Sequence, residues 1–319
     1  MKIFILGGDS GNYPSFFYQC IKALRDLGHE VDFFNYRPYK LHKFAVSNSV
    51  LNKYFLNKII KLNPDILIVI KGESLLKGVI NKINSKGIKT ACWALDEPFG
   101  RIYSMNKINN IPEYNYFFVF DPSYLDELKE INSNSFYLPV AADPINVHKE
   151  SIPIVNRDYS YDISFLGSYE PEREELFFSL GFPLTIFGMG WGKVKSNKKI
   201  KVINRPLFGK EMNKFFNNSK INLNIQALHG KESMNLRTFE VPATKSFVLT
   251  DFKKELPNLF ELDKEIVCYY DKEDLKEKIS YYLENEKERN KIALAGHERV
   301  MRDHKIIDRL RTMLKIIDL

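Results

Sequence analysis

The chain has 319 residues and a formal net charge of +7, and 44% of its residues are hydrophobic. This length suits about two domains of roughly 100–200 residues each, and the composition is that of a globular protein, not of a disordered or fibrous one. No block of Lys and Arg interleaves with aromatic residues, so a nucleic-acid partner is not indicated. The modest basic excess fits a solvated surface, an anionic ligand or peripheral contact with an acidic membrane.

The three cysteines, Cys20, Cys92 and Cys268, are far apart and show no C-x-x-C spacing. This pattern argues against a disulfide framework and against a structural zinc site. The apolar run in "MKIFIL" is too short for a signal peptide, and no run approaches the ~18 apolar residues of a membrane span. We therefore expect a cytoplasmic protein with reduced, buried thiols.

The first half of the chain alternates strand-like and helix-like segments. Expected strands are 2–6, 29–36, 65–72, 89–95 and 116–121, expected helices are 14–28, 74–87 and 122–132, and the segment 136–144 closes this half. This rhythm predicts a parallel sheet that is covered by helices on both faces.

The alternation restarts after a polar, proline-containing segment, 144–160, which we expect to be a linker. Expected strands are 162–168, 184–190, 221–226, 246–251 and 265–270, and expected helices are 171–180, 210–219 and a stretch 272–303 that is broken once. The sequence thus predicts two doubly wound α/β domains, at 1–145 and 155–298. They are expected to face one another across a cleft at the carboxyl ends of their strands.

Glycine-rich turns follow several of these strands. The first, Gly7-Gly8-Asp9-Ser10-Gly11, does not match the dinucleotide fingerprint G-x-G-x-x-G, although Gly8 can bring backbone close to a ligand. In the second half, amides of Gly167-Ser168 and of Gly188-Met189-Gly190 can hold pyrophosphate oxygens, and Arg173 can supply charge. Each of these residues also has a simpler interpretation. The turns can be plain chain reversals, Arg173 can be a solvated helix residue, and Trp191 can serve packing alone.

The stretch "NLRTFEVPATKSFVLTD", residues 235–251, carries the strongest signal. If a helix starts there, Arg237 and Glu240 lie on one face, beside amides that are free to bind a phosphate. Asn235 and Arg237 are then candidate donor contacts, and Glu240 can accept both hydroxyls of a ribose. Pro242 is costly deep inside a helix, so the first turn is expected to begin after Asn235. A surface Arg–Glu pair is the alternative.

This stretch resembles the C-terminal domain of nucleotide-sugar glycosyltransferases of the GT-B fold, and in particular the CgeB-like group. That group has the pattern N-x-R-x-F-E-x-x-A-x-G followed by an apolar strand and Asp, which is matched here by Asn235, Arg237, Phe239, Glu240, Ala243 and Asp251. Lys245 stands where the group has glycine, a departure that leaves its side chain able to reach a ligand. Segments 93–99, 120–144, 162–176, 184–191 and 272–304 also resemble the group, so the likeness covers nearly the whole chain.

The resemblance implies two Rossmann-like domains, the first binding an acceptor and the second a nucleotide sugar, with a helix from about 300 packing back on the first. It implies transfer of a sugar from a nucleoside diphosphate to a hydroxyl of a glycan, protein or lipid, without a bound metal or cofactor. Glu240 would bind the donor ribose. Glu232, eight residues earlier, resembles the E-x7-E pattern of retaining enzymes, although the CgeB-like group does not generally share it.

An inverting enzyme also needs a general base on the side of the first domain. Asp96 and Glu97 follow an expected strand and are our first candidates, with Asp9 and then Asp121 behind them. Each of these carboxylates fits a turn cap equally well.

Other positions are predicted with less support from the pattern. Further candidate donor contacts are Arg205 and His229. Arg205 lies within the segment 204–207 that is expected near the nucleobase, and His229 comes directly after a strand. His148 is expected to be solvated in the linker. Two rival functions remain open, a nucleotide-sugar epimerase of the same fold and a non-catalytic module that binds a nucleotide or glycan.

Overall fold

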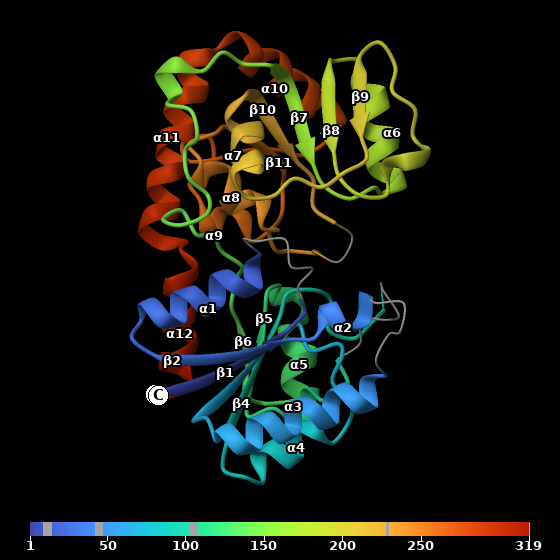
Figure 1. Ribbon diagram of the computed structural model, residues 1–319. Helices are drawn as coiled ribbons and strands as arrows, with labels where there is room; N and C mark the ends of the chain where they lie inside the picture. The colour runs from blue at the N-terminus through green and yellow to red at the C-terminus, as the bar shows by residue number, and fades with distance from the viewer. Residues whose placement is uncertain (9–14, 42–46, 102–107, 228–229, 319) are drawn as a thin grey trace. The chain divides into compact units, whose positions relative to one another are not determined.

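The computed structural model describes residues 1–8, 15–41, 47–101, 108–227 and 230–318, so Asp9 and His229 lie outside the described residues. The chain divides into two compact units (Figure 1). Unit 1 comprises Met1–Val140, a short segment that ends at Ser233, and the C-terminal segment from Ile306. Unit 2 comprises Ala141–Ala227 and Met234–Lys305.

Unit 1 is built on a parallel sheet with the strand order β2-β1-β3-β4-β5-β6. The strands are β1 (Lys2–Gly7), β2 (Glu30–Asn35), β3 (Ile66–Ile70), β4 (Lys89–Ala94), β5 (Tyr116–Val119) and β6 (Ser135–Tyr137). Every residue of β3 is buried, as expected for a parallel strand that is covered on both faces. The chain order reverses between β1 and β3, which is the topological switch point of this sheet.

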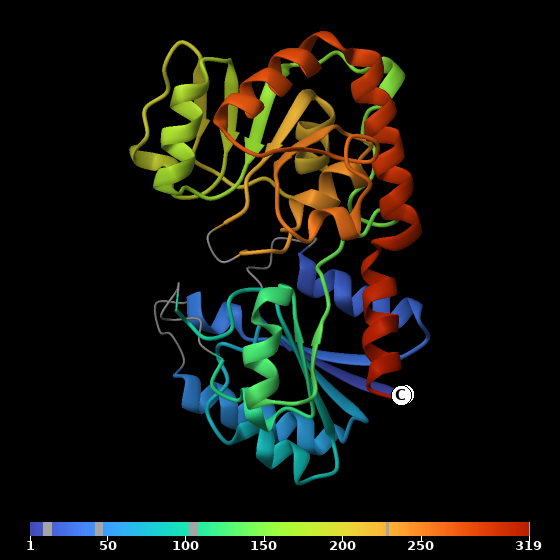
Figure 2. The ribbon, with the colours of Figure 1, turned by 180° about the vertical axis from the view of Figure 1, so that it is seen from behind.

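Helices cover both faces of the unit 1 sheet. They are α1 (Phe16–Asp26), α2 (Arg37–Leu41), α3 (Asn48–Leu62), α4 (Val79–Asn84), α5 (Leu125–Ile131) and α12 (Ile306–Ile316), with the 3-10 helices η1 (Ile111–Glu113) and η2 (Pro122–Tyr124). α12 packs against α1, and α3 packs against α4 (Figures 1 and 2). In α12 the buried Ile306, Leu310 and Met313 form the apolar stripe of an amphipathic helix.

Unit 2 contains a second parallel sheet, with the strand order β12-β11-β10-β7-β8-β9. The strands are β7 (Tyr161–Leu166), β8 (Leu184–Phe187), β9 (Ile200–Ile203), β10 (Ser219–Asn224), β11 (Val248–Asp251) and β12 (Val267–Tyr269). Counted from β7, this order is the 3-2-1-4-5-6 order of the dinucleotide-binding Rossmann fold. Its switch point lies between β7 and β10.

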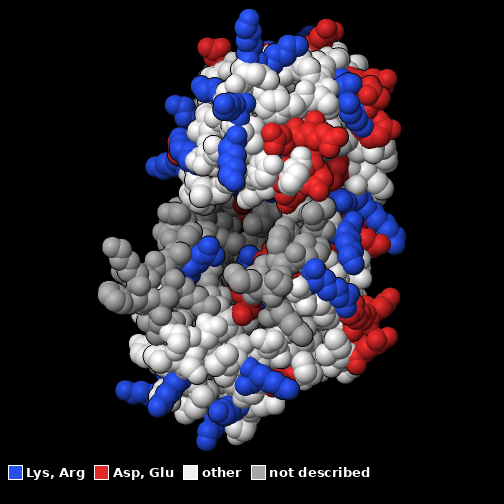
Figure 3. Space-filling model, turned by 90° about the vertical axis from the view of Figure 1, so that its right-hand side faces the viewer, with Lys and Arg blue, Asp and Glu red and all other residues white. Residues whose placement is uncertain are grey.

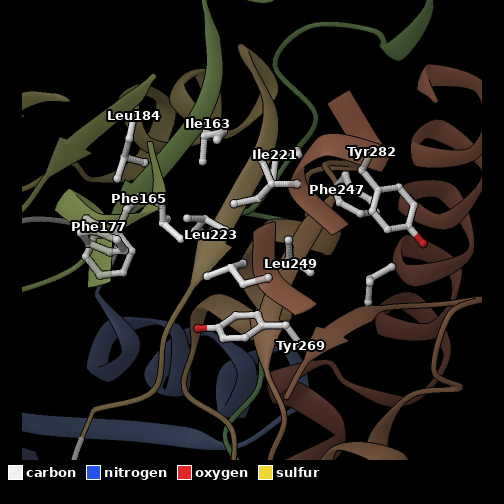
Figure 4. Packing of buried hydrophobic residues seen from close by; sticks show 14 of the residues in the cluster. Ile163, Phe165, Phe177, Leu184, Ile221, Leu223, Phe247, Leu249, Tyr269 and Tyr282 are labelled. Atoms are coloured by element: carbon white, nitrogen blue, oxygen red, sulfur yellow. The ribbon is translucent and has the colours of Figure 1, made fainter. Parts of the chain in front are cut away.

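The helices of unit 2 are α6 (Pro171–Leu180), α7 (Gly209–Asn217), α8 (Arg237–Ala243), α9 (Leu256–Leu259), α10 (Lys272–Glu284) and α11 (Glu286–Asp303), with η3 (Ile154–Asn156) and η4 (Trp191–Lys193). α6 contacts α10, and α8 contacts α11. Figure 4 shows side chains of β7, β10 and β11 meeting Phe177 of α6 and Tyr282 of α10 in one core. The long helical stretch is broken at Asn285.

The segment 144–160, expected to be a linker, belongs to unit 2 and is bonded into it. Asn217, at the end of α7, accepts hydrogen bonds from the Ser151 and Ile152 amides at 2.7 and 3.0 Å. Its Nδ2 donates to the Thr244 carbonyl and the Ser246 hydroxyl, both at 2.8 Å. The segment is therefore fixed to unit 2 by hydrogen bonds to its backbone.

In the part of the chain that the structure describes, no helix combines the length and the apolar character that crossing a bilayer requires. The three cysteines are buried free thiols. On the face shown in Figure 3, Lys and Arg side chains are spread over both units and Asp and Glu gather in patches. The basic excess therefore does not form one continuous band on this face.

Candidate functional site

Two arginines meet the carboxyl ends of β7 and β10, where the strand order of unit 2 reverses. Arg173 in α6 donates to the Ser168 and Ile225 carbonyls, each at 2.8 Å. Arg237, the first residue of α8, donates through Nε to the Leu166 carbonyl at 3.3 Å. The ends of parallel strands at a switch point are where open α/β sheets bind ligands. Here that position is cationic.

A buried carboxylate lies next to Arg237. Glu240 follows it by three residues in α8, and the Arg237 guanidinium bonds Oε2 of Glu240. The Glu240 side chain is 7% exposed and that of Arg237 is 27% exposed. Burial lowers the pKa of Arg237 to about 10, so the guanidinium stays cationic at neutral pH. The pair satisfies the rule that a buried charge needs a partner.

The other oxygen of Glu240 faces a residue that the sequence placed elsewhere. His148 Nε2 lies 3.3 Å from Glu240 Oε1, and the imidazole is 1% exposed. The expectation of a solvated His148 is wrong, because a turn built on Asp143 folds the ring into unit 2. Burial, and then the charge of Arg237, lower the pKa of His148 to about 3, so the ring is neutral at physiological pH.

The glycine turns after β7 and β8 are close to this site but do not offer free amides at every position. The Gly167 amide donates to the Phe187 carbonyl at 3.0 Å, and the Gly188 amide donates to the Ile203 carbonyl at 3.3 Å. The predicted pyrophosphate contacts through these two amides are therefore wrong. Gly188 is required for another reason, since a Cβ there would lie 1.7 Å from the Gly167 carbonyl oxygen.

The rest of these turns packs into unit 2. Gly190 has a left-handed φ of +88° and begins the short helix that carries Trp191. Trp191 is fully buried and donates from Nε1 to the Gly167 carbonyl at 2.9 Å, which agrees with a packing role. Ser168 is fixed through its carbonyl by Arg173. Arg173 itself is only 5% exposed, so it is not a solvated helix residue.

The start of α8 differs from the prediction. The helix begins at Arg237, as the proline required, but its first amides are already bonded. Asn235 Oδ1 accepts from the Arg237 amide at 2.9 Å, and Asn235 Nδ2 donates to Asn224 Oδ1 at 2.9 Å. The Glu240 amide donates to the Leu236 carbonyl at 2.9 Å. Asn235 is thus a helix-start residue that joins α8 to β10, and free amides for a phosphate were wrongly expected here.

Arg205 follows β9, an edge strand, and is bonded to the Glu211 carboxylate. Its guanidinium also lies over the Phe187 ring, 5.2 Å from the centroid. The side chain is 49% exposed. The structure therefore does not bring Arg205 together with Arg237 and Glu240 in the hydrogen-bonded group that surrounds the switch point.

In unit 1, Asp96 follows β4 and pairs with Lys71, which follows β3, at 2.5 Å. Lys71 has a left-handed φ of +73°, an uncommon conformation for a residue other than glycine and one that costs free energy. Burial lowers the pKa of Lys71, but the Asp96 carboxylate outweighs that effect and the net shift is upward. The side chains remain 39% and 28% exposed. The pair is thus an accessible, charged position beside the switch point of unit 1.

Gly8 follows β1 at the same switch point. A Cβ at Gly8 would lie 2.5 Å from a carbon of the Tyr36 ring, so this position excludes a side chain. Neither Gly7 nor Gly8 has a left-handed φ. Glycine is required here by close packing against aromatic rings.

Comparisons with known proteins agree with this architecture. The sequence model of a family described as "Glycosyl transferase-like" matches residues 172–315. The spore protein CgeB of Bacillus subtilis is 24% identical over 283 residues, which cover 83% of this chain and 86% of CgeB. Among solved structures, Anabaena HepE in complex with UDP-glucose has a TM-score of 0.70 at 9% identity, covering 100% of this chain and 99% of HepE. Sucrose-phosphate synthase of Thermosynechococcus elongatus has a TM-score of 0.69 at 9% identity and covers 99% of each chain.

The chain is CgeB-like and has the GT-B glycosyltransferase fold. At identities of 9% the solved structures define the fold of the CgeB-like chain and not its substrates. The sequence relationship and the fold together confirm the resemblance on which the prediction of fold class rested.

Two other carboxylates of the CgeB-like chain are turn or loop anchors. Asp121 is fully buried, and its Oδ2 accepts from the amides of Lys231, Glu232 and Ser233 at 2.8, 3.1 and 3.2 Å. Glu97 is 3% exposed and accepts from the amides of two residues that follow it, Phe99 at 2.9 Å and Arg101 at 2.7 Å. Asp121 is therefore not a base candidate, and the capping alternative describes both carboxylates.

Lys245, which replaces the glycine of the CgeB-like pattern, has a left-handed backbone conformation of the kind that favours glycine. Its φ is +55°. Its ammonium pairs with Glu150 at 2.9 Å, so the side chain binds within the fold. Lys245 precedes β11 and therefore lies at the amino ends of the strands, opposite the edge that carries Arg237.

Proposed function

We propose that this chain is a glycosyltransferase that moves a sugar from a nucleoside-diphosphate sugar to a hydroxyl of a glycan, protein or lipid. The observation that carries the proposal is the arrangement of Arg173, Arg237 and Glu240 at the β7/β10 switch point of a Rossmann-type sheet. The family match and the likeness to CgeB support glycosyl transfer in general. HepE, which has the same fold, was solved with UDP and with UDP-glucose.

In this proposal the donor binds to unit 2. Arg237 lies at the sheet edge with a guanidinium that is partly exposed and cationic, which suits contact with a diphosphate. Glu240 supplies a carboxylate that accepts hydrogen bonds from the ribose hydroxyls. Arg173 stays bonded to the strand ends and adds positive charge nearby.

The reaction then breaks the bond between the anomeric carbon and the diphosphate oxygen while the acceptor oxygen bonds that carbon. The leaving diphosphate takes the electron pair, and the preorganised charge of Arg237 stabilises it. We propose that this electrostatic role is filled by protein cations and that no metal ion is required. The acceptor proton passes to a base, for which Asp96 of unit 1 is the candidate in an inverting mechanism.

The test is incubation of the purified protein with radiolabelled sugar nucleotides, first without and then with candidate acceptors. Slow release of free sugar, and faster transfer once an acceptor is present, is the expected result. Isomerised sugar nucleotide or free epimer without acceptor would assign an epimerase instead. Binding without any turnover would assign a non-catalytic module. Repeating the assay with EDTA tests metal independence, since the proposal expects an unchanged rate.

A further inference from the structure

The imidazole of His148 is a buried polar group with an unfilled hydrogen-bonding position. Its Nε2 has no hydrogen-bond partner among the described residues, although Glu240 Oε1 lies 3.3 Å away, outside hydrogen-bonding geometry. A buried donor without a partner is costly, so it normally has a structural or functional reason. The nearest polar atom belongs to the carboxylate that the proposed function assigns to the donor ribose.

The hydrogen bond at Nδ1 shows which nitrogen of the neutral ring carries the proton. The Asp143 amide donates to His148 Nδ1 at 3.1 Å. A backbone N–H can only donate, so Nδ1 carries no proton and the proton of the neutral ring is on Nε2. The N–H of the ring is therefore on the side of Glu240, as second-shell histidines are oriented in metal and catalytic sites.

The turn that holds the ring is itself rigidly bonded. Asp143 Oδ1 accepts from the amides of Ile145 and Asn146 at 3.1 and 2.8 Å, and the Asp143 carbonyl accepts from the His148 amide at 2.7 Å. Asn213 of α7 donates to the Val147 carbonyl at 2.6 Å. Side chains that are held by packing and by a bonded backbone fix the geometry of their neighbours.

We propose that His148 is a positioning residue that holds the Glu240 carboxylate in the orientation that binds the donor ribose. When Glu240 turns toward the two ribose hydroxyls, Oε1 moves into line with the Nε2–H, and the buried donor gains its partner. His148 does not contact the nucleotide, because the ring is 1% exposed. This inference rests on the proposed function, since it requires a ribonucleotide at Glu240.

Two substitutions test the contacts of the two ring nitrogens separately. His148→Asn keeps an oxygen near the place of Nδ1, so it can still accept from the Asp143 amide, but it cannot reach Glu240. His148→Gln is longer and places an amide N–H near the position of Nε2. Asn therefore keeps the anchor and loses the contact with Glu240, whereas Gln restores that contact.

The experiment is calorimetric titration of the full chain with UDP, GDP and their 2′-deoxy counterparts. Wild type is expected to bind one ribonucleotide about ten- to a hundredfold more tightly than its deoxy form, because a hydroxyl hydrogen-bonded to a charged group is lost. In His148→Asn this ratio should fall to about threefold or less, while affinity for the deoxy form is unchanged. His148→Gln should recover most of the ratio.

The outcomes distinguish the two levels of the proposal. CDP and its 2′-deoxy counterpart are titrated in the same way, since the proposed function leaves the nucleobase open. If wild type binds none of these nucleotides, the proposed function fails and the inference fails with it. If wild type prefers the ribonucleotide and His148→Asn retains that preference, the inference alone is overturned. A fall in affinity for both sugar forms, together with a lower melting temperature in both variants, would show a merely structural role and would also overturn it.

Discussion

At the scale of single residues, one carboxylate oxygen of Glu240 pairs with the Arg237 guanidinium, and the other oxygen faces the imidazole of His148. Loss of its negative charge would leave the half-buried Arg237 guanidinium without its counter-ion. Hydrogen bonds from ribose hydroxyls to a carboxylate are also stronger than those to a neutral amide. In the proposed function, the donor site therefore requires the negative charge of Glu240 as well as the shape of its side chain.

Glu240→Gln is expected to weaken binding of the preferred nucleoside diphosphate by about ten- to a hundredfold, in line with hydrogen bonds to charged groups. Isothermal titration calorimetry measures this directly. Glu261→Gln is the matched control, because Glu261 is an exposed carboxylate paired with Lys264 and should change nothing. Unchanged affinity in Glu240→Gln would remove Glu240 from the donor site.

The lowered pKa of His148 also makes stability depend on pH. In the unfolded chain the ring protonates near its ordinary value of 6.5, whereas in the fold it resists protonation down to about 3. Stability is therefore complete above about pH 6.5 and is lost as the pH falls toward 3, at about 1.4 kcal/mol per pH unit. Between pH 7.5 and 5.0, wild type should lose about 2 kcal/mol more than His148→Gln in urea unfolding. Equal losses would contradict this assignment.

Asp96 is paired with Lys71 at 2.5 Å and remains partly exposed, so it can receive a proton from a bound acceptor. If it is the base, Asp96→Asn should lower kcat by about a hundredfold or more while the affinity for the nucleotide is kept. Rates at saturating donor, combined with calorimetry, separate the two effects. An unchanged kcat would favour a retaining mechanism or another base.

At the scale of elements, hydrogen bonds from neighbouring segments support the short helix α8. Only seven residues long and containing Pro242, α8 is stabilised from outside, by Asn235 at its start and by Arg157 and Asn217 at its end. Arg157 Nη2 and Asn217 Nδ2 both donate to the Thr244 carbonyl, at 3.1 and 2.8 Å. The same Asn217 accepts from the amides of Ser151 and Ile152, so the segment before β7 and the end of α8 share one anchor.

Asn217→Ala should therefore lower the free energy of unfolding by about 2–4 kcal/mol, because it removes all of the hydrogen bonds just described for this side chain at once. Asn258→Ala is the control, since Asn258 is exposed and its side-chain amide donates to the Glu255 carboxylate, and its effect should stay within about 0.5 kcal/mol. Urea denaturation reports both values. A loss for Asn217→Ala no larger than that of the control would show that these hydrogen bonds do not stabilise the fold.

The elements differ in how far their sequence predicts them. The apolar run of β3 could be recognised because parallel strands are buried on both faces. α3 was not predicted, because Val50 and Tyr54 are apolar on its exposed side while Leu51 and Phe55 are buried, which obscures the helical period. The start of α8 followed from Pro242 alone, since the cost of a proline in a helix is a local property.

The site was less predictable than the fold. The grouping of Arg237 with Glu240 followed from their spacing on one helical turn. The burial of His148 did not, because it depends on a turn closed by Asp143 and on contact with a helix about ninety residues later in the chain. Whether an amide is free, as was expected at Gly167 and Gly188, depends on neighbouring strands that local sequence does not reveal.

At the scale of the whole molecule, the chain builds two sheets of related but different connectivity. Unit 1 reverses strand order between β1 and β3, and unit 2 between β7 and β10, so each sheet has a switch point of its own. An ion pair lies beside each switch point, Lys71 with Asp96 in unit 1 and Arg237 with Glu240 in unit 2. This division suits a reaction that needs both an acceptor base and a donor site.

The central claim is that unit 2 binds a nucleoside diphosphate through Arg237 and Glu240. Thermal unfolding with UDP, GDP, dTDP and CDP tests it most directly, using wild type and Arg237→Ala side by side. A ligand at a hundred times its Kd stabilises the fold by about 2.7 kcal/mol, which raises the melting temperature by several degrees. Wild type should show such a rise with one of the four diphosphates, and Arg237→Ala should show little or none. No rise with any of them, or an equal rise in Arg237→Ala, would contradict it.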